Sequence, residues 1–143
     1  ELGYKYHMND ISAVLGIAQL KKVEKENRKR RELATQYTKE LSKLVAIQCP
    51  VVQPNVITSQ HNYVIRCNER DELHLYLRER NIFTGVHYLP LYKHPYYKRY
   101  SPDPCLRVTE REWQRLLLLP LYPQMTEEEQ GYVINEIKKF LIM

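Results

Sequence analysis

The chain has 143 residues, enough for one compact domain that buries about two-thirds of the surface its unfolded chain exposes. Its composition is 43% hydrophobic and 27% charged with only 4 glycines, which excludes disordered and collagen-like proteins. The longest purely apolar runs, such as Leu116–Leu119, fall far short of the roughly 20 residues of a membrane-spanning helix, and no signal-peptide pattern opens the chain. We therefore expect a cytoplasmic globular protein without a membrane partner.

The net charge of +5 permits a phosphate-bearing partner, such as a nucleotide, a nucleic acid or a phosphorylated cofactor, but does not choose among them. The three cysteines, Cys49, Cys67 and Cys105, show no CxxC spacing, so reduced structural thiols are expected rather than a disulfide framework or a zinc ribbon. The first residue is Glu1 rather than methionine. This start favours a piece of a longer polypeptide.

The N-terminal third of the chain is predicted to be helical. Asn9 or Asp10 can cap a helix whose apolar residues, from Ile11 to Leu20, surround most of its circumference. Such a helix should be buried on nearly all sides. From Val23 the pattern changes to a charged helix with one apolar stripe and a basic run on its solvent side, and the two segments form either one kinked helix or two. The stripe comprises Val23, Ala34, Tyr37, Leu41 and Leu44, and the basic run is residues 28–31.

The middle of the chain carries signals for strands and a helix. Residues 46–59 contain prolines and β-branched residues, which favours a strand followed by an irregular connection. Tyr63, Ile65 and Cys67 alternate with their neighbours at the period of a strand. Asn68 can cap the helix that follows, because the next apolar residues fit a single helical face.

The C-terminal half begins with a further predicted strand at residues 82–88. Residues 90–104 are rich in proline and tyrosine, which indicates a functional loop. Capping-box patterns at Thr109 and Thr126 predict two more helices, with a brief strand at 117–119 between them. We therefore predict an α+β fold, a two-layer arrangement in which helices cover a small, mainly antiparallel sheet.

Three separated phrases resemble those of the DegT/StrS-type aminotransferases. The first, at 3–20, runs Gly-Tyr-Lys-Tyr-His-Met-Asn-Asp-Ile and continues into a Gln-Leu pair. The second is Gly-Val-His-Tyr-Leu-Pro-Leu at 85–91, and the third is Leu-Leu-Pro-Leu-Tyr-Pro at 118–123, shortly before Thr126. Because they occur in the family's order and approximate spacing, the chain is identified as the C-terminal part of a fold-type-I sugar aminotransferase that depends on pyridoxal phosphate.

The resemblance implies that residues 1–143 form the small, C-terminal domain, with residues 1–22 as a connecting segment and helix that pack on a large domain or on the partner subunit. The complete enzyme would be a homodimer that aminates a nucleotide-linked keto-sugar, with an amino acid, glutamate by expectation, as donor. The family's Schiff-base lysine and the acidic partner of the pyridine nitrogen lie upstream of the first phrase. We therefore expect no catalytic residue here and no activity from the chain alone.

The resemblance also implies roles for individual residues. Lys5 stands where the family usually has a phosphate-contacting asparagine, and its ammonium could contact the cofactor phosphate of the neighbouring subunit or simply be exposed. His7 stands at the usual arginine position and either helps hold the sugar nucleotide or caps the following helix. His87 and Tyr88 end a predicted strand, and they either line the substrate cleft or form a structural turn locked by Pro90.

Other functions have weaker support. His61, His74 and His94 share no spacing with a cysteine or carboxylate cluster, so no metal site is expected. A non-catalytic binding or assembly module of the same architecture is the main alternative. Nucleic-acid binding ranks last, since it depends only on the basic run at 28–31 and on 12 dispersed tyrosines. The family also contains dehydratases that use the same cofactor without a Schiff-base lysine.

Overall fold

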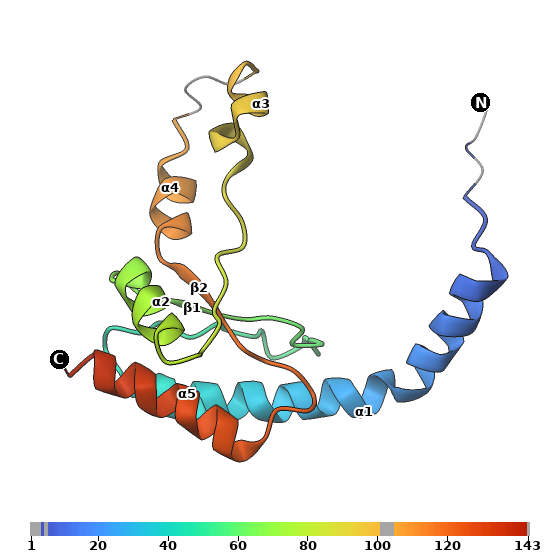
Figure 1. Ribbon diagram of the computed structural model, residues 1–143, viewed down its shortest axis with the longest axis horizontal. Helices are drawn as coiled ribbons and strands as arrows, with labels where there is room; N and C mark the ends of the chain where they lie inside the picture. The colour runs from blue at the N-terminus through green and yellow to red at the C-terminus, as the bar shows by residue number, and fades with distance from the viewer. Residues whose placement is uncertain (1–3, 5, 101–104, 143) are drawn as a thin grey trace.

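The computed structural model describes residues 4, 6–100 and 105–142 of the chain, shown in Figure 1. Its elements in chain order are α1 Asp10–Leu41, β1 Tyr63–Arg66, α2 Arg70–Arg78, the short 3-10 helix η1 Leu91–Lys93, α3 Pro95–Lys98, α4 Arg107–Trp113, β2 Leu116–Leu119 and α5 Glu127–Phe140.

The sheet consists of β1 and β2, which pair in antiparallel fashion with Tyr63 opposite Leu119. Isolated bridges add a segment on each side, because Gln48 pairs with Arg66 and Gly85 pairs with Leu118. The α+β prediction is confirmed. The strands predicted within 46–59 and 82–88 are wrong as regular elements, since each contributes a single bridge. Pro50 follows soon after Gln48 and has no N–H to continue a ladder.

The hydrophobic core lies between one face of the sheet and the helices α1, α2 and α5. Alternate strand residues are buried and directly opposite one another, as strand geometry requires. On this face Tyr63 stacks on Tyr37 of α1, with ring centroids 5.1 Å apart. Figure 1 shows α5 running beside the second half of α1, and the buried Gln130 of α5 donates a hydrogen bond of 2.7 Å to the carbonyl of Leu33.

α1 is one continuous helix, although its first part bends away from the body of the domain (Figure 1). Asn9 is its N-cap, as predicted, and accepts a hydrogen bond of 2.8 Å from the backbone N–H of Ser12. In the predicted apolar stripe Ala34, Tyr37 and Leu41 are buried and Leu44 is partly buried, while Val23 is exposed. The described ranges contain no helix with both the length and the apolar character needed to cross a membrane.

Only one of the predicted capping boxes exists. Thr126 accepts a hydrogen bond from the Glu129 N–H, and the Glu129 carboxylate accepts one from the Thr126 N–H, so α5 begins as predicted. Thr109 is already inside α4, because that helix starts two residues earlier with Leu106 as its N-cap. The cap predicted at Asn68 is also wrong, since α2 starts one residue later, after Glu69.

Candidate functional site

A pocket of about 260 Å³ lies at the edge of the sheet and contains the predicted residue His87. Three chain segments line it, residues 61–62 just before β1, residues 83–87, and residues 118–121 at the end of β2. They meet because β1 pairs with β2, and because Gly85 pairs with Leu118 through backbone hydrogen bonds of 3.0 and 2.8 Å. The second and third family phrases therefore share one site.

The position of the His87 imidazole depends on the absence of a side chain at Gly85. A Cβ at that position would lie 3.0 Å from Nε2 of His87 and 3.3 Å from Cδ2 of Leu118, so the ring would have to shift by a few tenths of an ångström. The ring of Tyr88 stacks on the same imidazole, with centroids 4.7 Å apart and planes within 8° of parallel. The His87–Tyr88 peptide is cis. Tyr88 is exposed and does not line the pocket itself.

The third phrase is held in place from the core side. The buried Tyr37 donates a hydrogen bond of 3.0 Å from its hydroxyl to the carbonyl of Pro120, which lines the pocket. Burial raises the pKa of Tyr37 far above its ordinary value, so the hydroxyl keeps its proton and remains a donor. The backbone at Pro120 is thus anchored to α1 through the side chain of Tyr37.

The first family phrase lies apart from this pocket. Lys5 lies outside the described residues. His7 is exposed ahead of α1, and Figure 1 shows the start of α1 well separated from the sheet. His7 is not among the residues that line the pocket at His87. The alternative that His7 caps α1 is wrong, because Asn9 supplies the cap.

None of the described residues in the segment rich in proline and tyrosine lines the pocket. It forms η1 and α3, which extend with α4 away from the body of the domain (Figure 1). Tyr92 and Lys93 bind the carboxylate of Glu110 on α4, with Lys93 Nζ 2.9 Å from it. The Tyr92 and Lys93 contacts lower the pKa of Glu110, and the carboxylate in turn raises the pKa of Tyr92 to about 12. Residues 90–100 of the predicted loop therefore form short helices, and these are joined to α4 through Glu110.

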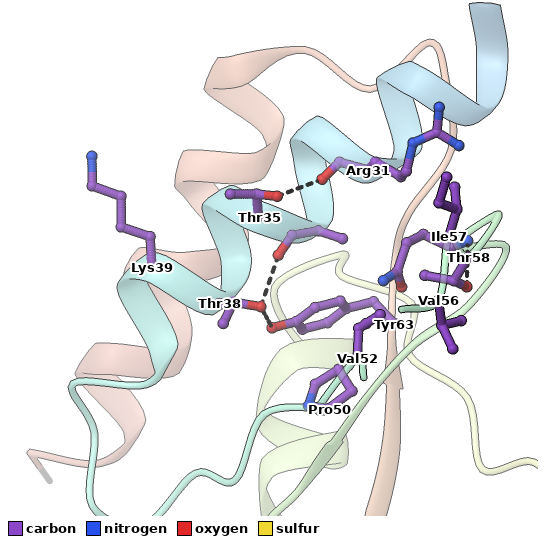
Figure 2. Close-up of a pocket in the computed structure, with 12 residues that line it drawn as sticks. Arg31, Thr35, Thr38, Lys39, Pro50, Val52, Val56, Ile57, Thr58 and Tyr63 are labelled. Atoms are coloured by element: carbon purple, nitrogen blue, oxygen red, sulfur yellow. Dashed lines mark hydrogen bonds between the residues drawn. The ribbon is translucent and has the colours of Figure 1, made fainter. Parts of the chain in front are cut away.

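A larger cavity, about 740 Å³, lies elsewhere, between α1 and the connection at 50–60. Figure 2 shows its threonine hydroxyls already engaged, because Thr35 donates to the Arg31 carbonyl and Thr38 bonds the Ala34 carbonyl and the Tyr63 hydroxyl. The side chain of Lys39 extends away from the cavity in the same view. Its walls are otherwise mostly apolar, and it contains none of the predicted site residues. It therefore offers few free polar groups for a specific ligand.

Sequence reasoning missed two polar residues of the pocket at His87. His61 and Asn62 line it from the N-terminal side of β1, and the Asn62 Nδ2 lies 3.1 Å from the His61 Nε2. The available signal was their position directly before a period-two strand, but only the strand pairing reveals which segments they face. No group of three or more potential metal ligands occurs among the residues that the structure describes.

The comparisons with known proteins place the chain among aminotransferases. Residues 1–138 match the DegT/DnrJ/EryC1/StrS aminotransferase family, so the chain belongs to this family. The uncharacterized protein MJ1066 of Methanocaldococcus jannaschii is 35% identical over 149 residues, which cover 99% of this chain and 39% of that protein.

Solved structures agree with this assignment. The aminotransferase TlmJ of Streptoalloteichus hindustanus is 28% identical, with a TM-score of 0.87 over 94% of this chain and 37% of its own. DesV of S. venezuelae is also 28% identical, with a TM-score of 0.84 over 92% of this chain and 36% of its own. The chain thus spans well under half of the length of these relatives, and it corresponds to their C-terminal part, as predicted.

The cofactor predicted from the resemblance is confirmed at the level of the family, whose enzymes use pyridoxal phosphate. The described residues do not form a complete site for it. Neither a lysine nor an arginine is among the described residues that line the pocket at His87, whereas the cofactor requires an amine for its aldehyde and cationic or N–H donors for its phosphate. No reaction step through the cofactor can therefore be assigned to the described residues.

Proposed function

We propose that this chain is the small-domain part of a pyridoxal-phosphate-dependent enzyme that transfers an amino group from an amino acid, glutamate by expectation, to a nucleotide-linked keto-sugar. The complete enzyme works as a homodimer, and its Schiff-base lysine belongs to the polypeptide upstream of this chain. Alone, the chain is inactive. The cofactor supplies the electron sink for the transfer when it is bound.

The observation that carries the proposal is the meeting of the second and third family phrases at one pocket. Residues 85–87 and 118–121 are about thirty positions apart in the chain, yet they line the same 260 Å³ space through the bridge between Gly85 and Leu118. A concave site with a few polar groups over an apolar floor suits a small polar ligand. Membership in the aminotransferase family and the likeness to TlmJ and DesV support the reaction class.

The predicted residues have separate proposed roles, which rest on the family resemblance and, for His87 and Tyr88, on the pocket. His87 contacts the substrate directly, and Tyr88 holds its ring by stacking at 4.7 Å. Lys5 and His7, which precede a helix whose first half is exposed, act on the neighbouring subunit, Lys5 at the cofactor phosphate and His7 at the sugar nucleotide. The chain therefore contributes one wall of its own site and one arm to the site of its partner.

The test uses the complete polypeptide that contains this chain, loaded with pyridoxal phosphate. Glutamate alone should change the absorbance spectrum of the bound cofactor, and amino-sugar product should form when nucleotide-linked keto-sugars are added. The 143-residue chain should give neither signal. A complete polypeptide that binds no cofactor would favour the non-catalytic assembly module, and spectral change without amination of any keto-sugar would exclude the substrate class.

A further inference from the structure

The pocket at His87 contains a second imidazole, that of His61, to which the sequence phrases assign no role. His61 and Asn62 directly precede β1, whose first residue, Tyr63, lies opposite Leu119. Continuing this antiparallel register places residues 61–62 beside residues 120–121, and all four line the pocket. These residues therefore lie where the pairing of the two strands ends.

One hydrogen bond joins the side chains of these two residues, with the Asn62 Nδ2 3.1 Å from the His61 Nε2. Because a carboxamide nitrogen only donates, this contact fits a His61 tautomer in which Nε2 accepts and Nδ1 faces a ligand as a donor. The carboxamide oxygen of Asn62 adds an acceptor beside it.

The chemistry of the lining groups favours a neutral, hydroxyl-rich ligand. Imidazole and carboxamide groups each offer donors and acceptors, which match hydroxyl groups that both donate and accept. None of the residues found to line this pocket is a lysine or an arginine, the side chains that a diphosphate would favour. Leucine and proline side chains at 118–121 provide an apolar surface for the C–H face of a ring.

We propose that His61, oriented by Asn62, contacts the hydroxyls of the sugar ring of the substrate in the same pocket as His87. This inference rests on the proposed function, because it assumes a nucleotide-linked sugar as ligand. The two parts of that ligand then bind at different places, the sugar ring beside His61 and His87 and the nucleoside diphosphate outside this pocket.

The test is a calorimetric titration of the complete, cofactor-loaded protein with two probe pairs. UDP-glucose is compared with UDP, and dTDP-glucose with dTDP, so that each pair differs only by the sugar. His61→Ala should weaken binding of the preferred sugar nucleotide about 3- to 10-fold, the size of one lost neutral hydrogen bond, and leave the nucleoside diphosphate unchanged. His94→Ala, a histidine outside the pocket, should change neither.

Each other outcome counts against the inference in a distinct way. If His61→Ala weakened binding of the sugar nucleotide and of its nucleoside diphosphate equally, the pocket would bind the diphosphate. If His61→Ala left the affinity for the sugar nucleotide unchanged, His61 would not belong to the site. Because His61 is exposed, its substitution should leave the thermal midpoint of unfolding unchanged, which controls for misfolding. A wild-type protein that binds none of the four probes would overturn the nucleotide-sugar substrate itself, and the inference with it.

Discussion

At the scale of single residues, Gly85 controls where the imidazole of His87 lies. Replacing it with alanine places a Cβ 3.0 Å from the His87 Nε2, and we expect the exposed ring to move because the neighbouring backbone is held by the bridge to Leu118. The displaced ring should raise the KM for the sugar substrate several-fold in the complete enzyme, with little change in the free energy of unfolding, about 0.5 kcal/mol or less.

Gly131→Ala is the matched control for this prediction. Gly131 lies inside α5, and a Cβ there would meet no atom within 4 Å. The substitution should therefore leave KM unchanged and stabilise the helix by about 0.5–1 kcal/mol, measured by urea unfolding. If Gly85→Ala left the KM and the His87 ring resonances unchanged, the positioning role of Gly85 would be wrong.

At the scale of elements, the two threonine patterns provide a direct test of helix capping. Thr126 accepts from the backbone at the start of α5, so Thr126→Ala should lower the free energy of unfolding by about 1 kcal/mol. Thr109 has the same sequence pattern but lies within α4, so Thr109→Ala should leave stability unchanged or slightly improved. Urea unfolding of the two variants distinguishes them, and an equal loss in both would contradict the observed start of α4.

The contacts of Glu136 between α5 and the end of α2 should make the free energy of unfolding depend on pH. The buried carboxylate of Glu136 on α5 binds Lys139, Tyr76 and Arg80, at 2.6, 3.1 and 3.0 Å. The hydrogen bond from Lys139, with help from Tyr76 and Arg80, lowers the pKa of Glu136 in the folded state. A carboxylate whose pKa is lowered by folding stabilises the protein fully at pH values above the pKa of glutamate in the unfolded chain. This stabilisation is lost as the pH falls through the lowered pKa of the folded state.

Glu136→Gln should therefore lower the thermal midpoint by a few degrees at pH 7, and the gap to wild type should close as the pH falls below about 4. The control is Glu79→Gln, because Glu79 contacts the same Arg80 only at 3.7 Å and its side chain is 78% exposed. That variant should follow the wild-type profile. If the difference in thermal midpoint between Glu136→Gln and wild type stayed constant down to pH 3, the charge of the Glu136 carboxylate would not stabilise the contact between α2 and α5.

The sequence correctly predicted those elements whose capping residues and hydrophobic periodicity lie within a short segment of the chain. α5 carries its cap and its buried face within fifteen residues, and β1 shows strict alternation from Tyr63. The bridges at Gln48 and Gly85 depend instead on partners far along the chain, so local composition overstated them as strands. The pairing of distant segments also explains why His87 was found by its phrase, whereas His61 required the register of the sheet.

At the scale of the whole molecule, the first part of α1 extends away from the sheet (Figure 1). This part of the helix carries a large exposed apolar surface. Ile11, Val14, Leu15, Ile17 and Leu20 are each at least 57% exposed. Surfaces of this kind mark sites of contact with other protein. We propose that this half helix packs on the large domain or on the partner subunit in the complete enzyme, as the family resemblance implies.

The 143-residue chain alone should therefore self-associate, which sedimentation velocity at several concentrations measures. Leu15→Glu puts a charge into the apolar surface, and it should raise the dissociation constant at least tenfold, because burial of one leucine contributes about 1.5–3 kcal/mol. Leu75→Glu is the matched control, since Leu75 on α2 is 57% exposed and Leu15 is 60% exposed. A chain that stays monomeric at every concentration, or equal weakening by both substitutions, would show that α1 is not the contact surface.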